Sequence, residues 1–358
     1  MDSQSIISII QGLLVFVVLL VFVNLYLVVR LKEIDPFKTW NRNLLNGGLF
    51  MVFFISGVAL ATVSMVKWYP KMILLHNPAS EHGVALDSMM WNTIWVTFLV
   101  VIVTNSLLFW FSWKYRGVEG RKGLYYPHNN RLEYLWTGVP AIVMTLLVGK
   151  GIIVWNDITM GDPKPGEISI EVVGKQFDWT YRYPGADGQF GETKVGFIKP
   201  GTNEVGFNTN DKYAFDDIVL AGADTVYFPV NNSIDLQIRA RDVLHSATLA
   251  HFRVKMDAVP GMPTSFRFTP TLTTAEMRKR TNNPDFNYEM SCQQICGGGH
   301  WNMRRVIKVV SKEEYSAWLA SKTSYFKQNA VALGLTDQDF EDVAAAFAEE
   351  AETLSMNQ

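Results

Sequence analysis

The chain has 358 residues, of which 48% are hydrophobic and 13% aromatic, and its formal net charge is −2. Its two cysteines are too few for a disulfide scaffold, and no basic stripe suggests a nucleic-acid partner. Residues 1–155 carry 12 Lys and Arg against 7 Asp and Glu, whereas residues 156–358 carry 20 against 27. Because the basic half is also the apolar half, we expect membrane helices flanked by cations.

Four apolar runs are long enough to cross a bilayer, which takes about 20 residues. They are Ile6–Val29, Leu49–Val66, Thr93–Phe111 and Leu135–Trp155. A buried core helix is the alternative for each run taken alone. The first run lacks a basic n-region and a small-residue cleavage site, so we expect a retained helix rather than a signal peptide.

Loop charges predict the orientation of these four spans. The loops after the first and third runs are rich in cations, whereas the loop after the second has only Lys67 and Lys71. Positive residues favour the cytoplasmic side of a membrane. We therefore expect both termini and the large C-terminal region on the outer side of a bacterial inner membrane. Glu133, at the cytoplasmic start of the fourth run, is either an interfacial helix-start charge or a site of proton uptake.

After Trp155 the pattern changes to short strands separated by Gly, Pro, Asn and Asp. Seven segments fit a strand, beginning at Ile168, Phe177, Thr225, Ile234, Ala250, Ser265 and Val306. So many short strands predict a β-sandwich or barrel, and the lack of strand–helix alternation argues against a parallel α/β sheet. The tail, residues 312–358, is predicted to be helical and acidic.

The loop from Cys292 to Met303 contains both cysteines, together with His300 and Met303. Thiolate, imidazole and thioether form the ligand set that selects copper, and His245 is a further donor upstream. Two thiolates so close together can bridge two metal ions. Glycines at 297–299 let the loop turn back without Cβ clashes.

The alternative for this loop is a disulfide or redox thiol pair, with His300 and Met303 as ordinary packing residues. Cys-x3-Cys taken alone favours that alternative, and the accompanying histidines and methionine favour copper. His251 alternates with strand residues and is expected to be structural.

With these features, the chain resembles subunit II of the haem–copper cytochrome c oxidases over residues 85–325. Five segments of the sequence carry the resemblance: Glu133–Ala141, Gly174–Trp179, Asp242–Ser246, Met256–Gly261 and Cys292–Met303. The resemblance implies a cupredoxin-like sandwich with a dinuclear copper centre, CuA. It also suggests four domains: an extra N-terminal hairpin (1–70), the family's membrane hairpin (71–157), the CuA domain (158–311) and the tail (312–358).

The resemblance assigns a role to each residue of the site. Cys292 and Cys296 would bridge the two coppers, and His245 and His300 would each bind one of them. Met303 would be a weak axial ligand, and the last ligand would be the backbone carbonyl of Gln294. Glu133 would stand at the mouth of a proton channel leading into subunit I.

Three departures from the family pattern stand out. Gln294 replaces a glutamate that helps to hold magnesium at the interface with subunit I, which puts the magnesium site in question and leaves the copper site supported. Phe177 replaces the tryptophan through which electrons arrive, although Trp179 is retained; Phe177, Trp179 and Trp301 all remain candidates. Residues 1–70 have no counterpart in the family.

The implied function is that of the electron-accepting subunit of a proton-pumping oxidase, which takes electrons from cytochrome c and passes them to haem in subunit I for reduction of O2. The partners would be subunit I, other oxidase subunits, membrane lipid, and cytochrome c or a complex-bound cytochrome c domain. One alternative is a copper-free quinol oxidase subunit II, which would lack the ligand set. The other is a membrane-anchored copper chaperone or thiol oxidoreductase, which would need a thioredoxin-like βαβ pattern.

Overall fold

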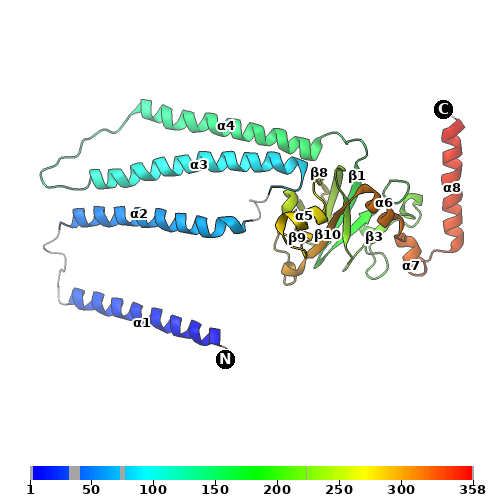
Figure 1. Ribbon diagram of the computed structural model, residues 1–358, viewed down its shortest axis with the longest axis horizontal. Helices are drawn as coiled ribbons and strands as arrows, with labels where there is room; N and C mark the ends of the chain where they lie inside the picture. The colour runs from blue at the N-terminus through cyan, green and yellow to red at the C-terminus, as the bar shows by residue number, and fades with distance from the viewer. Residues whose placement is uncertain (1–2, 32–40, 73–76, 223, 357–358) are drawn as a thin grey trace. The chain divides into compact units, whose positions relative to one another are not determined.

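The computed structural model describes all residues except 1–2, 32–40, 73–76, 223 and 357–358 (Figure 1). By its internal contacts the chain divides into two compact units. The first comprises Met1–Trp68 and Val96–Asn129, and the second comprises Tyr69–Trp95 and Asn130–Gln358. The four predicted domains are not separated by this division and remain a prediction.

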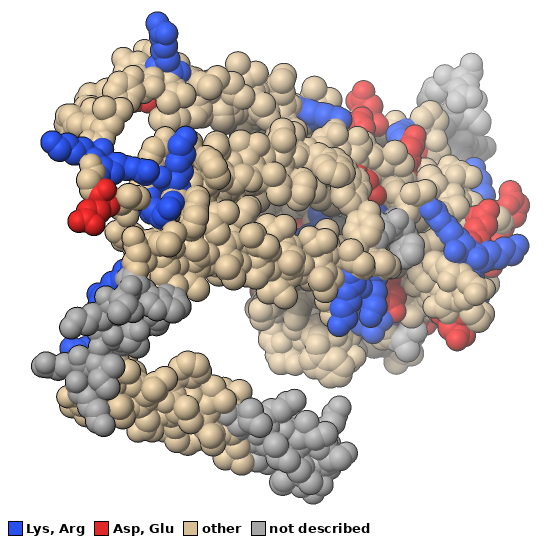
Figure 2. All heavy atoms as spheres, turned by 60° about the vertical axis from the view of Figure 1, so that its left-hand side comes forward, with Lys and Arg blue, Asp and Glu red and all other residues tan. Residues whose placement is uncertain are grey.

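Three long apolar helices correspond to three of the four predicted spans. α2 (Arg42–Trp68), α3 (Glu81–Lys114) and α4 (Asn130–Met160) are each long and apolar enough to cross a bilayer. The fourth helix, α1 (Ser3–Leu31), has a shorter apolar stretch among its described residues, Val15–Leu31. On the face seen in Figure 2, the sides of the helices are almost free of charged atoms, as contact with lipid requires.

Within the first unit, α2 packs on the part of α3 that belongs to it. The ring of Phe109 is buried, with its centroid 4.5 Å from that of Phe50 and 4.4 Å from that of Phe54. At Gly47 of α2 the two helices are packed closely, because a Cβ there would lie only 3.2 Å from the indole of Trp113. The extra N-terminal region therefore supplies a helix that packs directly on α3.

Residues from Ile168 onward form two five-stranded sheets, as expected for a β-sandwich. The first sheet has the order β3-β2-β1-β5-β8 and the second β4-β10-β9-β6-β7. The pairs β1–β5 and β10–β4 are parallel, and the other pairs are antiparallel. The strands are β1 (Ile168–Lys175), β2 (Asp178–Tyr183), β3 (Ile218–Leu220), β4 (Val226–Pro229), β5 (Ile234–Ala240), β6 (His245–Leu249), β7 (Val254–Ala258), β8 (Thr264–Phe268), β9 (Tyr288–Cys292) and β10 (Arg304–Val310).

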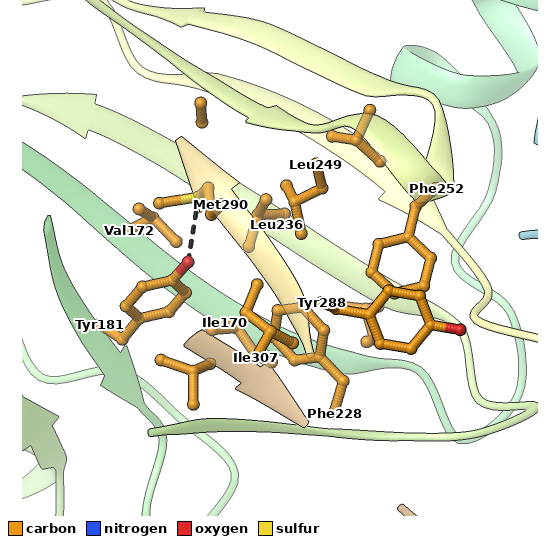
Figure 3. Packing of buried hydrophobic residues seen from close by; sticks show 14 of the residues in the cluster. Ile170, Val172, Tyr181, Phe228, Leu236, Leu249, Phe252, Tyr288, Met290 and Ile307 are labelled. Atoms are coloured by element: carbon orange, nitrogen blue, oxygen red, sulfur yellow. Dashed lines mark hydrogen bonds between the residues drawn. The ribbon is translucent and has the colours of Figure 1, made fainter. Parts of the chain in front are cut away.

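The core lies between the two sheets (Figure 3). Alternate side chains of β1 and β5, such as Ile170 and Leu236, meet residues of the second sheet such as Ile307. The hydroxyl of Tyr181 lies 3.0 Å from the Sδ atom of Met290 across this core. Such packing gives the strands that hold the site a rigid base.

Two details of the strand prediction were wrong. The segment from Ala250 was expected to be one strand, but residues Ala250–Phe252 form a 3-10 turn and β7 begins only at Val254. Three strands, β3, β6 and β9, were not expected at all; in β6 all five residues are buried, so the polar–apolar alternation is missing.

Helices complete the described part of the sandwich unit. The short helix α5 (Thr274–Thr281) precedes β9, and the tail forms α6 (Lys312–Ala320), α7 (Tyr325–Leu333) and α8 (Asp337–Met356). Phe326 of α7 packs against Phe207 and Phe215 in a second, smaller core. The helical tail is thus confirmed, and it is packed against the sandwich.

Candidate metal centre

The loop with the two cysteines connects β9 to β10 in the second sheet. Its ends are joined, because the amide of Cys292 donates to the carbonyl of Met303 at 3.1 Å. In between, the amide of His300 donates to the carbonyl of Gly297, whose φ of +137° favours glycine. The strand pair therefore closes this loop on itself and turns His300 back toward the cysteines.

His245 reaches the same place from a neighbouring strand. It is the first residue of β6, which pairs with β9 so that Ala247 lies opposite Cys292. The imidazole is fully buried, and its Nδ1 lies 3.9 Å from Cys292 Sγ. Residues 47 positions apart in sequence are thus brought together by one strand pairing.

The predicted ligand atoms gather around the two sulfurs. Cys296 Sγ lies 3.5 Å from His300 Nδ1 and 3.3 Å from Met303 Sδ. Cys292 Sγ lies 3.2 Å from the carbonyl oxygen of Gln294. These five residues and His245 are the six proposed from sequence, and the structure brings all of them together.

The donor set fits a thiophilic metal. Ligand atoms of His245, Cys292 and Cys296 all lie within 4.8 Å of one another, and all three residues are buried. Both cysteines are free thiols. Burial, followed by the neighbouring Cys292, raises the pKa of the Cys296 thiol to about 11. A metal must therefore displace protons from these sulfurs, and binding would release protons into solution.

Asp242 orients the imidazole of His245. Its Oδ1 lies 2.9 Å from Nε2 of His245, and its Oδ2 accepts a hydrogen bond from the amide of Gln176 at 2.7 Å. Although burial acts to raise it, these hydrogen bonds lower the pKa of Asp242. An ionised carboxylate at Nε2 favours the tautomer whose Nδ1 lone pair faces the sulfurs, as in carboxylate–histidine–metal arrangements.

Gln176 links two of the loops at the site. Its side-chain amide donates to the carbonyl of Cys296 at 2.5 Å. Glu204 forms ion pairs with both Lys175 and Arg241. Lys175 directly precedes Gln176, and Arg241 directly precedes Asp242. The turn after β1 and the loop after β5 are thus fixed to each other and to the metal loop.

The sequence analysis did not assign roles to Asp242 or Gln176. Both lie in segments quoted for the family resemblance, and the spacing Asp-x-x-His places a carboxylate three residues before a ligand. That spacing was the available signal for Asp242. Gln176 carried no comparable signal, because its contact with Cys296 joins residues 120 positions apart.

The three aromatic candidates differ in exposure. Trp179 is fully buried, and its ring centroid lies 5.8 Å from that of His245. Phe177 is 40% exposed and lies so close to the loop that a Cβ at Gly299 would be 2.5 Å from its ring. Trp301, beside His300, is 78% exposed. Phe177 and Trp301 are therefore accessible at the surface, whereas Trp179 packs in the core against His245.

Glu133 is not part of this cluster. It is exposed in the first turn of α4, whose other end at Met160 leads toward the sandwich. With a rise of 1.5 Å per residue, about 40 Å of helix separates Glu133 from Met160. Any role of Glu133 is therefore distinct from metal binding.

Comparison with known proteins gives a consistent result. Residues 168–310 match the family described as cytochrome c oxidase subunit II, periplasmic domain. The alternative cytochrome c oxidase subunit 2 of Bradyrhizobium diazoefficiens is 29% identical over 233 residues, which is 65% of this chain and 78% of that protein. Cytochrome c oxidase subunit 2 of Cereibacter sphaeroides is 27% identical over 227 residues, 62% of this chain and 70% of that protein.

Among solved structures, the periplasmic domain of subunit II of the Bradyrhizobium japonicum cytochrome oxidase is 26% identical to this chain. It covers 44% of this chain and 94% of its own, with a TM-score of 0.30. The matched residues, 168–310, contain both sheets and every predicted copper ligand. Residues 168–310 therefore match the periplasmic domain of cytochrome c oxidase subunit II, and the chain is similar to subunit 2 proteins over about two thirds of its length.

Proposed function

We propose that this chain is the electron-accepting subunit of a haem–copper oxidase and that it holds a dinuclear copper centre. The observation that carries the proposal is the gathering of two free thiols, two imidazoles, a thioether and a carbonyl oxygen in one cluster, in which His245, Cys292, Cys296 and Met303 are buried. A copper pair held by these residues would supply one-electron redox chemistry.

The residues of this chain would hold that centre with little movement. Cys292 and Cys296 would hold it through their sulfurs, His245 and His300 through imidazole nitrogens, and Met303 through its thioether. The Gln294 carbonyl would complete the set, and its uncharged side chain leaves magnesium out of the proposal. Because β6, β9 and β10 are paired strands over a packed core, the ligands need not rearrange when an electron arrives.

The test of this proposal is metal analysis of the purified oxidase complex. We expect about two coppers per copy of this chain beyond those of the other subunits, and absorption in the visible and near infrared from a mixed-valence pair. Zinc, or no metal, in folded material would exclude the function. A copper-free quinol oxidase subunit or a dithiol chaperone would show no such absorption.

The membrane part would anchor this centre at the outer surface. The three long apolar helices and α1 are proposed as four spans, with both termini and the sandwich on the periplasmic side of a bacterial inner membrane. Subunit I would accept the electron, and other oxidase subunits and lipid would cover the helices. The proposed domain limits stay as predicted, at residues 70, 157 and 311.

Glu133 is proposed as the mouth of a proton path into subunit I. We expect Glu133→Gln to slow oxidase turnover severalfold without changing copper content, because an amide cannot release a proton. Glu119→Gln, which changes another exposed carboxylate in the loop before α4, is the control. Turnover of Glu133→Gln at the wild-type rate would remove this role.

The electron donor is proposed to be a membrane-tethered or complex-bound cytochrome c domain. Residues 156–310 carry 17 Lys and Arg against 18 Asp and Glu, so the sandwich lacks the excess of acid that would attract a soluble basic cytochrome c. We expect oxidation of such a cytochrome by the complex to be slow and nearly independent of salt. Fast oxidation that collapses as salt is added would contradict this assignment.

A further inference from the structure

Arg253 occupies a position where its backbone conformation is unfavourable. It ends the 3-10 turn between β6 and β7, with φ of 59° and ψ of 29°, in the left-handed region. Glycine adopts this region freely, whereas a long side chain does so at a cost, and such a residue persists where its surroundings hold it. The contacts of the Arg253 side chain are therefore of interest.

The guanidinium of Arg253 forms a two-pronged contact with helix α3. Its Nε donates to Asp87 Oδ1 at 2.7 Å, and its Nη2 donates to Asp87 Oδ2 at 2.9 Å. The side chains are only 6% and 15% exposed, respectively. A bidentate arginine–carboxylate pair that is shielded from water is both strong and fixed in direction.

The chain just before α3 is joined to the same turn. The amide of Ala79 donates to the carbonyl of His251 at 2.8 Å, and the Ser80 hydroxyl donates to the carbonyl of Phe252 at 2.6 Å. Space is tight there, since a Cβ at Gly83 would lie 3.1 Å from Cγ of Arg253. The first turn of α3 is therefore seated directly on the turn that follows β6.

This turn lies at the opposite end of β6 from the metal site. The strand β6 runs from His245 to Leu249, a distance of about 14 Å at 3.4 Å per residue. It is hydrogen-bonded on one side to β7 and on the other to β9, which ends at Cys292. A displacement of the turn against α3 would thus move the ligand strand as a unit.

We propose that Asp87 and Arg253 form a clasp that fixes the metal-bearing sandwich on membrane helix α3. Holding β6 against α3 keeps the metal ligands at a constant distance from the acceptor in the partner subunit. This role rests on the proposed electron transfer, and both residues are positioning residues that do not touch the metal. Electron transfer depends steeply on distance, so loss of the clasp would slow it without emptying the site.

The first variant is Arg253→Gly, because glycine relieves the backbone cost while it removes the guanidinium, including the donation from Nη1 to the carbonyl of Ala250 at 2.9 Å. Asn282→Gly, which relieves the positive φ of 50° at the end of α5, is the matched control. Asp87→Asn removes the charge from the other side, and the swap Asp87→Arg with Arg253→Asp restores a pair. All four are made in the intact oxidase complex.

Two measurements are made on each variant. Hydrogen exchange of the amides of residues 79–81 reports whether α3 stays seated, whatever metal is bound. Flash-induced electron transfer from the copper to haem reports the distance, and copper content and absorption spectrum report the site. We expect Arg253→Gly and Asp87→Asn to exchange faster and to transfer electrons about tenfold more slowly, with an unchanged spectrum and with recovery in the swap.

Exchange in Arg253→Gly equal to that of the wild type would overturn the clasp. Faster exchange with an unchanged internal electron-transfer rate would overturn its positioning role. A wild-type complex that holds no copper in this chain would instead refute the proposed function, and the positioning role with it. In that case the exchange measurement alone still decides whether Arg253 seats α3.

Discussion

Cys296→Ser is expected to abolish copper binding by this chain. Changing a residue that only orients a ligand typically costs about 10–100-fold in metal affinity, so removing a sulfur that lies close to donor atoms of His245, Cys292, His300 and Met303 should cost more than 100-fold. Serine has nearly the same shape as cysteine, but it offers a hard hydroxyl oxygen in place of the soft thiolate sulfur. The measurement is copper per chain in the purified complex, together with the visible and near-infrared spectrum.

Asp242→Asn is the graded companion to that variant. It leaves every ligand in place and changes only the group that orients His245, so we expect an affinity loss of about 10–100-fold. Circular dichroism should show an unchanged sandwich in both variants. Retention of two coppers by Cys296→Ser would remove this cysteine from the proposed centre.

Arg182→Met is expected to destabilise the sandwich by about 3–5 kcal/mol, the usual cost of breaking a buried ion pair. Arg182 on β2 lies 2.9 Å from Glu171 and 3.5 Å from Asp217, and all three side chains are almost completely buried. Burial raises the pKa of Asp217 to about 8, with Arg182 acting in the opposite direction. Methionine would remove the buried cation that Glu171 faces at 2.9 Å and would leave the Asp217 carboxyl group without the guanidinium beside it.

The measurement for Arg182→Met is thermal unfolding of the detergent-solubilised chain, followed by circular dichroism. A loss of this size corresponds to a fall of about 10 °C in Tm for a unit of this length. Arg304→Met is the matched control, because its pair with Glu289 is exposed and should contribute less than about 1 kcal/mol. Equal Tm values for the two variants would contradict the expected contribution of the buried pair.

The metal loop was predictable because its information is local. Cys292, Cys296, His300 and Met303 lie within twelve residues, and their chemistry narrows the choice of metal before any fold is known. The apolar runs are local signals of the same kind, and three of them form helices long enough to span a membrane. The existence of a sandwich followed from the number of short strand segments.

The strands and contacts that hold the metal ligands in place were not predictable from the sequence in this way. β6 and the contact between Gln176 and Cys296 arise from strand pairing between distant segments, which leaves no periodic trace in the sequence. Solvent exposure was not predictable either, since Trp179 and Trp301 are the same residue type, yet Trp179 is fully buried and Trp301 is 78% exposed.

The sequence by itself therefore determined which atoms could bind a metal and that the chain carries membrane helices. Only the tertiary structure decided which imidazole nitrogen faces which sulfur, which carboxylate orients His245, and how Arg253 meets Asp87. The physical reason is range. Ligand chemistry and hydropathy belong to residues close together in sequence, whereas orientation comes from packing and hydrogen bonds between strands and helices far apart in it.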